Sequence, residues 1–287
     1  MIDLLSENSV ALILVTVLLG LIVGSFLNVV ILRLPRMMEL AWKRECREIL
    51  ELPAVETEPL SLMSPPSRCP QCAAPVRAWQ NIPVISWLLL RGRCATCATS
   101  ISVQYPLVEV STALLSAVCA WKFGWSGQLA GALVLTWALV TLAAIDLRTQ
   151  LLPDSITLPL LWLGLALGFF PVFASLHDAV LGAIAGYLSL WSVFHVFRLL
   201  TGKEGMGHGD FKLFAALGAW LGWQCLPQII LLASVVGAVV GLSLIVLQRQ
   251  GKEIPIAFGP YLAAAGWIAL IWGHSITAAY LGASGLG

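Results

Sequence analysis

Long uninterrupted stretches of apolar residues recur along this chain, and they constrain its fold more than any other feature. The stretches run for roughly 17–23 residues, the length at which an α-helix crosses a hydrocarbon layer of about 30 Å. Of the 287 residues, 59% are hydrophobic and only 11% are charged. A water-soluble domain carries about 25% charged residues. The sequence therefore predicts a membrane protein that crosses the bilayer several times.

The predicted fold class is an all-α polytopic membrane protein with about eight transmembrane helices. The expected spans are residues 10–32, 106–121, 128–145, 155–173, 179–197, 211–226, 228–247 and 260–274. The first span is expected to be retained rather than cleaved as a signal peptide. The residues before it are acidic instead of basic, and no small-residue cleavage site follows it.

The positions of lysine and arginine predict how the chain is oriented. When eight spans are threaded, every Lys and Arg except Lys122 falls on one side of the membrane. Cytoplasmic loops carry the excess of these residues in membrane proteins, so that side is predicted to be the cytoplasm. Both termini are then expected on the opposite face.

One sizeable polar segment, residues 33–105, separates the first two spans. Its charged stretch, 37–58, suits a short surface helix, although its role cannot be assigned, and a proline-rich linker follows at Pro59, Pro65 and Pro66. The expected domains are an N-terminal transmembrane helix (1–32), a cytoplasmic module (33–105) and a seven-helix membrane domain (106–287).

Two C-x-x-C pairs in this module predict a zinc-ribbon-like site. The pairs, Cys69 with Cys72 and Cys94 with Cys97, are separated by 21 residues. Each tight turn presents two sulfurs, and two turns complete a tetrahedral, four-thiolate zinc site with a structural role. Two disulfides or a redox pair are the alternatives, and the predicted cytoplasmic location disfavours disulfides. Nucleic-acid binding is not expected, because the basic residues nearby are no more than a cytoplasmic loop requires.

Ionisable residues within spans are costly and usually mark function, and four acidic residues lie in or beside the spans. Glu109 follows Pro106, which opens a span, so it is expected to complement the helix dipole. Asp154 lies just before a span and is placed as an N-cap. Both are therefore interpreted as structural or supporting residues.

Asp146 and Asp210 are interpreted as the catalytic pair. Asp146 ends an apolar helix, where the dipole disfavours an anion. Asp210 follows a glycine-rich run, and Gly207 and Gly209 are expected to allow close backbone approach or unusual backbone conformations. Two adjacent carboxylates share a proton, so one can act as a base on water while the other polarises a carbonyl. This is the arrangement of an aspartic protease. His208, between two of the glycines, is interpreted as a solvated loop residue.

Several motifs resemble those of the type IV prepilin peptidases, members of the GxGD class of membrane aspartic proteases. In chain order they are Gly24-Ser-Phe-Leu-Asn28 with Arg33-Leu-Pro35, the two cysteine pairs, Tyr105-Pro-Leu-Val-Glu109, Ile145-Asp146 with Leu152-Pro-Asp154, Gly207-His-Gly-Asp210-Phe-Lys212-Leu and Ala257-Phe-Gly-Pro-Tyr261. The resemblance extends over nearly the whole chain.

The resemblance implies an enzyme of the bacterial inner membrane, with both termini in the periplasm. Its substrates would be prepilins or pseudopilins, cleaved after the glycine that ends a short basic leader on the cytoplasmic face. Many members also methylate the new N-terminal residue with S-adenosylmethionine. For that activity the resemblance points to the stretch before the second cysteine pair, with Gly92 and Arg93 as candidates. Pilus assembly and type II secretion cannot be separated, and no oligomeric state is implied.

Two other function classes compete with this interpretation. A proton-coupled transporter also uses buried carboxylates, but the chain shows no convincing inverted repeat, and both aspartates are expected at one face. A membrane-anchored interaction protein, whose zinc module recruits partners, would leave the two aspartates unexplained.

Overall fold

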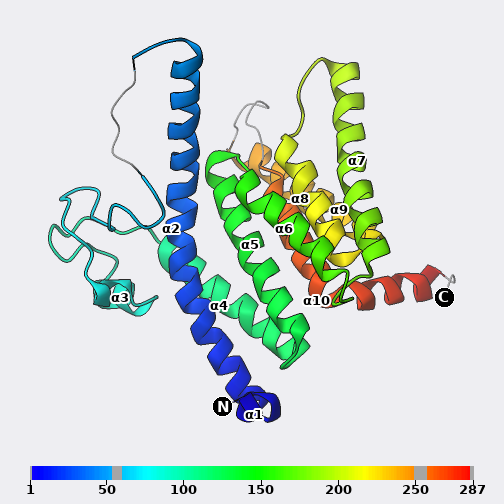
Figure 1. The fold of residues 1–287 in the computed structure, drawn as a ribbon, viewed down its shortest axis with the longest axis horizontal. Coiled ribbons are helices and arrows are strands. Elements are labelled where there is room, and N and C mark those ends of the chain that lie inside the picture. Colours follow the sequence, from blue (N-terminus) through cyan, green and yellow to red (C-terminus); the bar gives the residue numbers. More distant parts are fainter. Residues whose placement is uncertain (1, 54–59, 249–256, 285–287) are drawn as a thin grey trace. The chain divides into compact units, whose positions relative to one another are not determined.

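A computed structural model describes residues 2–53, 60–248 and 257–284, and within them the chain is built of helices (Figure 1). In chain order the helices are α1 (Ile2–Glu7), α2 (Ser9–Ile49), η1 (Ala78–Asn81), α3 (Ile85–Leu89), α4 (Gln104–Phe123), α5 (Gly127–Thr149), α6 (Asp154–Leu167), α7 (Leu176–Thr201), α8 (His208–Leu221), η2 (Trp223–Cys225), α9 (Leu226–Gln248) and α10 (Gly259–Ser284). The described ranges contain two isolated β-bridges and no β-strand.

Each predicted span overlaps one of these helices, and the all-α membrane fold is confirmed. Among the described residues, five helices are long and apolar enough to cross a membrane: those within Ser9–Ile49, Gln104–Phe123, Gly127–Thr149, Leu176–Thr201 and Trp223–Ser243. Several predicted ends were wrong, and besides α2 the largest differences are in α6 and α10. Helix α6 stops at Leu167, six residues early, and α10 continues to Ser284. Arg249 and Lys252, two of the basic residues from which the orientation was predicted, lie outside the described residues.

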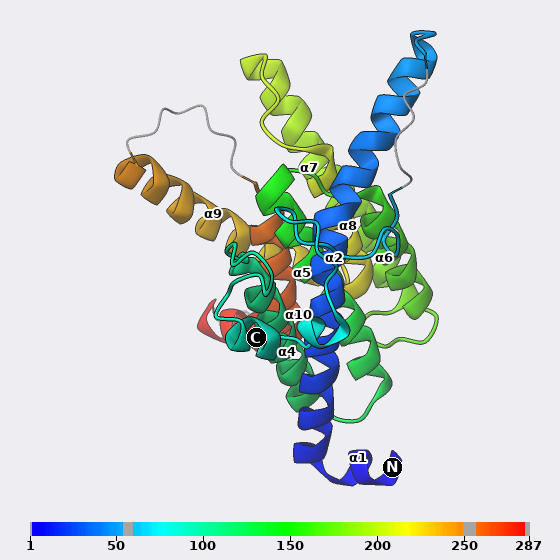
Figure 2. The same ribbon diagram turned by 90° about the vertical axis from the view of Figure 1, so that its left-hand side faces the viewer.

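The chain divides into two compact units, Met1–Trp125 and Ser126–Gly287. The first is dominated by α2, whose 41 residues extend for about 62 Å, twice the hydrocarbon thickness. The separate surface helix predicted within residues 37–58 was wrong, because α2 runs without interruption through Pro35 to Ile49 (Figure 2). The side chain of Asn8 begins α2 by accepting hydrogen bonds from the amides of Val10 and Ala11 at 3.0 and 3.1 Å.

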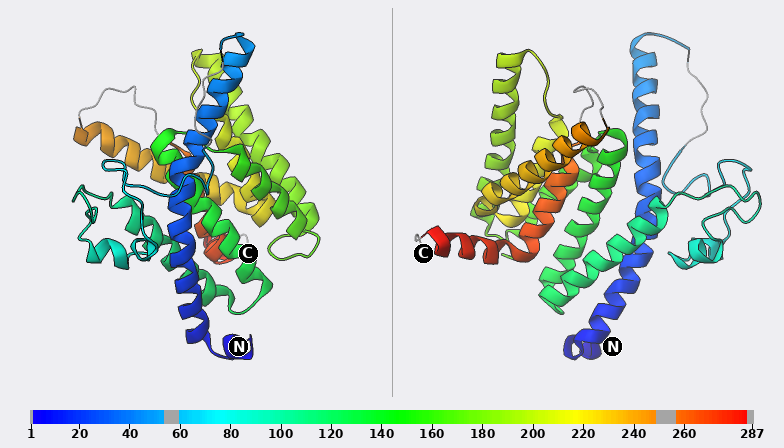
Figure 3. Two further views of the ribbon diagram at one scale, coloured as in Figure 1. Left: turned by 60° about the vertical axis from the view of Figure 1, so that its left-hand side comes forward. Right: turned by 180° about the vertical axis from the view of Figure 1, so that it is seen from behind.

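Two glycines spaced four residues apart let α2 cross α4 closely. A Cβ atom added at Gly20 or Gly24 would lie 2.8 Å from a backbone Cα of α4, at Ala113 or Glu109 respectively. This is the small-residue packing by which helices associate in membranes. The segment between these two helices carries η1 and α3 and returns to lie beside α2 (Figure 3).

The second unit is built around α8, the most buried helix of the described chain. Every residue of α8 from Leu213 to Trp220 is buried, and its neighbours are α6, α7, α9 and α10. A helix that is apolar on all sides belongs at the centre of its domain. At its far end the indole N–H of Trp220 donates to the carbonyl of Leu160 in α6 at 2.7 Å, so the buried nitrogen is satisfied.

Helices α7 and α8 cross at a pair of facing glycines, Gly182 and Gly218. A Cβ atom built on either glycine would collide with the carbonyl oxygen of the other. One turn further along α7, a Cβ at Gly186 would lie 2.7 Å from the carbonyl oxygen of Phe214. The crossing is therefore made backbone against backbone, which leaves no room for side chains.

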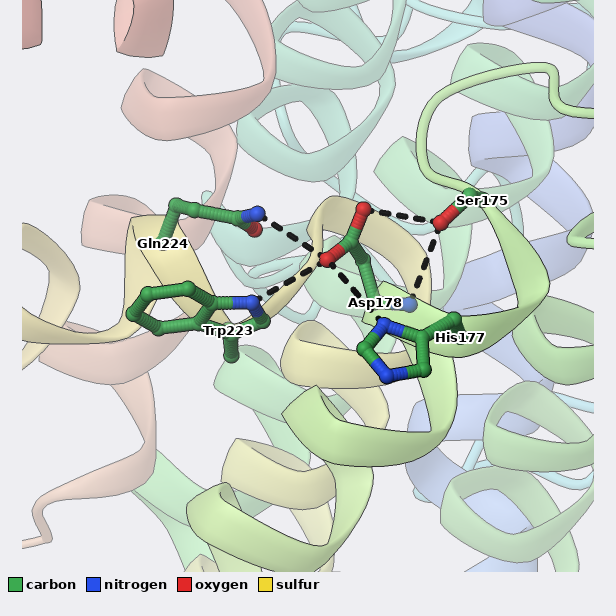
Figure 4. Close-up of polar contacts among 5 residues, drawn as sticks. All are labelled: Ser175, His177, Asp178, Trp223 and Gln224. Carbon is green, nitrogen blue, oxygen red and sulfur yellow. Dashed lines mark hydrogen bonds and ion pairs between the residues drawn. The ribbon is translucent and has the colours of Figure 1, made fainter.

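Asp178 organises the end of this helix pair next to the glycine crossing, where α7 begins and α8 ends (Figure 4). Ser175 is the N-cap of α7, and its hydroxyl donates to Asp178 Oδ2 at 2.8 Å. Asp178 Oδ1 accepts from Trp223 Nε1 at 3.1 Å and Gln224 Nε2 at 3.0 Å, which joins η2 to the beginning of α7. The hydroxyl of Ser175 is directed at Asp178 rather than at His177, so this group is a helix cap rather than a catalytic triad.

The glycine crossing yields a stability prediction. Gly182→Ala should destabilise the protein by about 1–3 kcal/mol, because the new methyl group must displace the backbone of α8. The measurement is thermal unfolding in detergent, where we expect Tm to fall by about 2–4 °C per kcal/mol. Gly127→Ala, at a helical glycine whose added Cβ has no atom within 4 Å, is the matched control and should not lower Tm. Equal Tm values for the two variants would contradict the close crossing.

Candidate active site and metal centre

Asp146 lies in the last turn of α5 and is 5% exposed. The negative end of the α5 dipole disfavours its charge, but a second helix compensates. Asp146 Oδ2 accepts a hydrogen bond of 3.0 Å from the amide of Gly259, the first residue of α10. The first amides of a helix lack partners within that helix and carry its positive end, so α10 binds the carboxylate as a helix N-terminus binds an anion.

Asp210 lies in the first turn of α8 and is 6% exposed. The N-cap of α8 is Gly207, whose carbonyl accepts the Asp210 amide at 3.2 Å, so Asp210 itself is not the cap. Within the described residues, Asp210 Oδ1 is buried without a hydrogen-bond partner. An unpartnered buried carboxyl oxygen is costly, and it leaves one acceptor or donor site open for chemistry.

The structure brings Asp146 and Asp210 together at one end of the second unit. The amide of Gly259 binds Asp146, and Gly209 directly precedes Asp210. Both glycines lie against the same side chain, that of Leu152. A Cβ added at Gly209 would lie 2.6 Å from Leu152 Cβ, and one added at Gly259 would lie 3.2 Å from Leu152 Cδ1.

Gly209 makes the predicted close approach, whereas a Cβ added at Gly207 would meet only Asp210 Oδ2, at an ordinary 3.6 Å. The expectation of unusual backbone conformations was wrong for both glycines. Neither Gly207 nor Gly209 has a positive φ angle. A Cβ at Gly259 would lie 2.6 Å from Asp146 Oδ2, so this position must also be glycine for the amide to reach the carboxylate. Gly259 was missed as a site residue, although the Ala257–Tyr261 motif contained the signal.

Asp154 does not cap α6, contrary to the sequence interpretation. It is the first residue of that helix, after the N-cap Pro153. Both of its carboxylate oxygens instead accept from Lys212 Nζ at 2.7 Å. Because Lys212 follows Asp210 in the first turns of α8, this ion pair holds the beginning of α6 against the beginning of α8. His208 is exposed, as expected, but it begins α8 instead of lying in a loop, and its ring lies 5.0 and 5.5 Å from those of Phe194 and Phe211.

Glu109 has a different role from the one predicted. Helix α4 begins at Gln104, so Glu109 lies beyond its first turn and does not complement the N-terminal dipole. Its buried carboxylate accepts the amide of Val84 at 2.7 Å, immediately before α3. Glu109 thus fixes the module between α2 and α4 to the side of α4.

The four predicted metal ligands converge. Their Sγ atoms all lie within 4.8 Å of one another. Cys69 Sγ and Cys97 Sγ are 3.7 Å apart, which matches the edge of about 3.8 Å expected for four thiolates at 2.3 Å from one zinc ion. The donor set therefore fits a four-coordinate metal ion. A hydrogen bond with the Thr99 side chain, aided by the Thr99 backbone, lowers the pKa of Cys97 to about 6, which favours the thiolate that binds metal.

The two cysteine pairs are built alike. Each first cysteine accepts the amide of the residue four positions on, Ala73 or Ala98, at 2.9 and 3.0 Å. Both alanines have positive φ angles, 55° and 57°. Each loop is closed by a single antiparallel bridge, Arg68 with Pro75 and Arg93 with Ser100. The segment forms two equivalent knuckles that share one site.

The candidates for methylation lie in the second knuckle. Gly92 has φ 65°, and a Cβ there would lie 2.8 Å from the ring of Trp87. Its carbonyl accepts the amide of Ile101 at 2.7 Å. Gly92 therefore supports the packing of Trp87, whereas the side chain of Arg93 is exposed.

Comparison with known proteins identifies the class. Residues 18–123 match the Bacterial Peptidase A24 N-terminal domain, and residues 133–242 match the Type IV leader peptidase family. Proteins named prepilin leader peptidase/N-methyltransferase match this chain over almost its whole length. The one from Stutzerimonas stutzeri is 57% identical, covering 98% of this chain and 97% of its own. Those from Pseudomonas aeruginosa and Aeromonas hydrophila are 55% and 58% identical, covering 98% and 92% of this chain and 97% and 92% of their own lengths.

The chain therefore belongs to the type IV leader peptidase family. No solved structure matches it.

The contact between Gly209 and Leu152 can be tested directly. Gly209→Ala should lower the stability by about 1–3 kcal/mol, because the added methyl group overlaps the Leu152 side chain. Gly207→Ser is the control. Its Cβ would meet only Asp210 Oδ2, at 3.6 Å, and serine is a favourable N-cap residue. We expect thermal unfolding in detergent to show a lower Tm for Gly209→Ala alone, and a wild-type Tm for that variant would refute the contact.

Proposed function

We propose that this chain is a membrane aspartic endopeptidase that removes the leader from prepilins or pseudopilins and N-methylates the new N-terminus. The names of its relatives support both activities. The observation that carries the peptidase mechanism is the pairing of two buried carboxylates, Asp146 and Asp210, beside each other at the ends of α5 and α8. The names of these relatives give no support to the alternative interpretation as a proton-coupled transporter.

In the proposed mechanism the two aspartates share one proton. The amide of Gly259 stabilises the charge of Asp146, so this residue is suited to be the carboxylate that takes a proton from water. Asp210, whose Oδ1 has no partner within the described chain, is suited to hold the proton and donate a hydrogen bond to the scissile carbonyl. Attack by the water gives a tetrahedral intermediate. Its collapse breaks the peptide bond, and the shared proton passes to the leaving amine.

The surrounding residues hold this pair in place. Gly209 lets the beginning of α8 approach Leu152, and the ion pair of Asp154 with Lys212 fixes the beginning of α6. In the first unit, Glu109 holds the zinc-binding module to α4 through the amide of Val84. We propose a functional division into residues 1–32, 33–105 and 106–287, with the active site in the last.

The proposed orientation puts the cleavage site at the cytoplasmic face of the bacterial inner membrane. The excess of lysine and arginine on that side supports it, with both termini in the periplasm. A prepilin leader is basic and remains in the cytoplasm, so the bond that follows its final glycine would reach the aspartates without crossing the bilayer.

For methylation, S-adenosylmethionine would supply an activated methyl group to the newly exposed amine. Gly92 and Arg93 remain the candidates for this activity. The exposed guanidinium of Arg93 is available to a carboxylate such as that of the methyl donor's amino-acid portion.

Cleavage of a purified prepilin by the detergent-solubilised enzyme tests the proposal. Asp146→Asn and Asp210→Asn should each reduce the rate by at least about 100-fold, because an amide cannot take up or donate the proton that the two carboxyl groups share. Gel shift measures cleavage, and mass spectrometry of the product identifies the cut site and any N-methyl group. Glu204→Gln, which removes an exposed carboxylate in the loop before α8, is the control and should keep full activity. Wild-type rates for either aspartate variant would refute the dyad.

We propose zinc as the metal of the four-cysteine site, because four thiolates select a tetrahedral, soft-ligand metal without an open position. Elemental analysis of the purified protein should find about one zinc ion per chain. Cys97→Ser should lose it, whereas Cys46→Ser, which removes an exposed thiol of α2, should retain it. Equal zinc contents in these two variants would count against the assignment.

A further inference from the structure

The short helix α3 exposes an apolar face that the module itself leaves uncovered. Ile85, Leu88 and Leu89 are 55%, 60% and 72% exposed. They are spaced i, i+3 and i+4, so they share one side of the helix. Trp79 in η1 and Ile82 in the connecting turn are also exposed. A cluster of five large apolar side chains on so small a module requires a partner.

The other face of α3 is already committed to the zinc-binding module. Ser86 is buried, and the indole of Trp87 packs against Gly92. The indole N–H also donates to the carbonyl of Ile101 at 3.3 Å. These contacts fix the rotation of α3 about its axis, so its apolar side cannot turn inward onto the module.

Glu109 sets the level of this face relative to the membrane. It accepts the amide of Val84, the residue directly before α3. Glu109 lies five residues beyond Gln104, where α4 begins, and therefore about 7.5 Å along the axis of this membrane-spanning helix. Figure 1 and the right-hand view of Figure 3 accordingly draw α3 beside α2 and below the beginning of α4, not beyond it.

Basic and aromatic residues border the apolar face. Arg77 precedes η1, Arg91 follows α3, and both side chains are exposed. Tryptophan and arginine are the residues that anchor a segment at the boundary between acyl chains and headgroups, and arginine is attracted to anionic lipids. An apolar face with this border, held at the depth of a spanning helix, fits a lipid surface.

We propose that residues 79–89 form an interfacial anchor, which inserts the side chains of Ile82, Ile85, Leu88 and Leu89 into the acyl boundary of the bilayer beside α4. The zinc-binding module then lies on the membrane instead of projecting freely into the aqueous phase. The partner is the lipid, with anionic headgroups at Arg77 and Arg91. This inference rests on the membrane-spanning helices and does not depend on the peptidase proposal.

Depth-dependent fluorescence quenching in reconstituted vesicles tests the anchor. A small fluorescent non-natural residue is introduced singly at Leu89 by codon suppression, so the cysteines remain intact. The full-length protein is placed in phosphatidylethanolamine–phosphatidylglycerol vesicles with or without dibrominated acyl chains. Aqueous iodide is the opposing quencher. The same residue at Leu18, an exposed apolar position of α2, marks the lipid, and at Gln71, exposed in the first knuckle, it marks the aqueous phase.

We expect the label at position 89 to behave like that at 18, with emission at least halved by brominated lipid and little affected by iodide. Iodide quenching as strong as at position 71, without a response to brominated lipid, would overturn the proposal. Iodide quenching that disappears only when a prepilin is added would also overturn it, in favour of a protein-docking surface. A label at Ile85 repeats the measurement on the same face, and zinc content reports that each labelled module is folded.

Discussion

The hydrocarbon layer contains no water to solvate a charge or an unpaired amide, so each polar group within it must find its partner inside the protein. Asp146 meets this requirement with the first amide of α10, 113 residues away in the chain. That single bond joins the end of one helix, where an anion is disfavoured, to the beginning of another, where it is favoured. The position of α10 and the glycine at its first residue both depend on this bond.

The same requirement accounts for the glycines that recur at helix contacts. Hydrophobic association is weak between helices that are already surrounded by lipid, so close packing must hold them together. Gly20 and Gly24 bring α2 onto α4, and the facing pair Gly182 and Gly218 bring α7 onto α8. The helix that carries Asp210 is thereby fixed by backbone contacts, which do not change with side-chain rotamers.

Local patterns in the sequence predicted the helices and the cysteine site, because span length and C-x-x-C spacing depend on near neighbours. Contacts between distant segments were missed. The role of Glu109 depends on an amide 25 residues before it, and the pairing of Asp154 with Lys212 joins two helices 58 residues apart. The first span was predicted to end at residue 32, whereas α2 continues to Ile49. The sequence indicated the two buried aspartates, and the Ala257–Tyr261 motif marked the region of Gly259. The hydrogen bond from the Gly259 amide to Asp146 was not predictable, because no periodicity marks a contact between helix ends.

Helices α6 and α8 have only 14 residues each, a length of about 21 Å, and so fall about 9 Å short of the hydrocarbon thickness. Both begin at the end of the unit where Asp146 and Asp210 lie. Non-helical backbone at membrane depth is tolerated only where protein buries it or water reaches it. The backbone that leads into α8 at Gly205–Gly207 therefore has to be covered by protein or reached by water where this short helix begins. Because hydrolysis consumes water, two helices too short to span the hydrocarbon layer suit such a site better than full-length spans would.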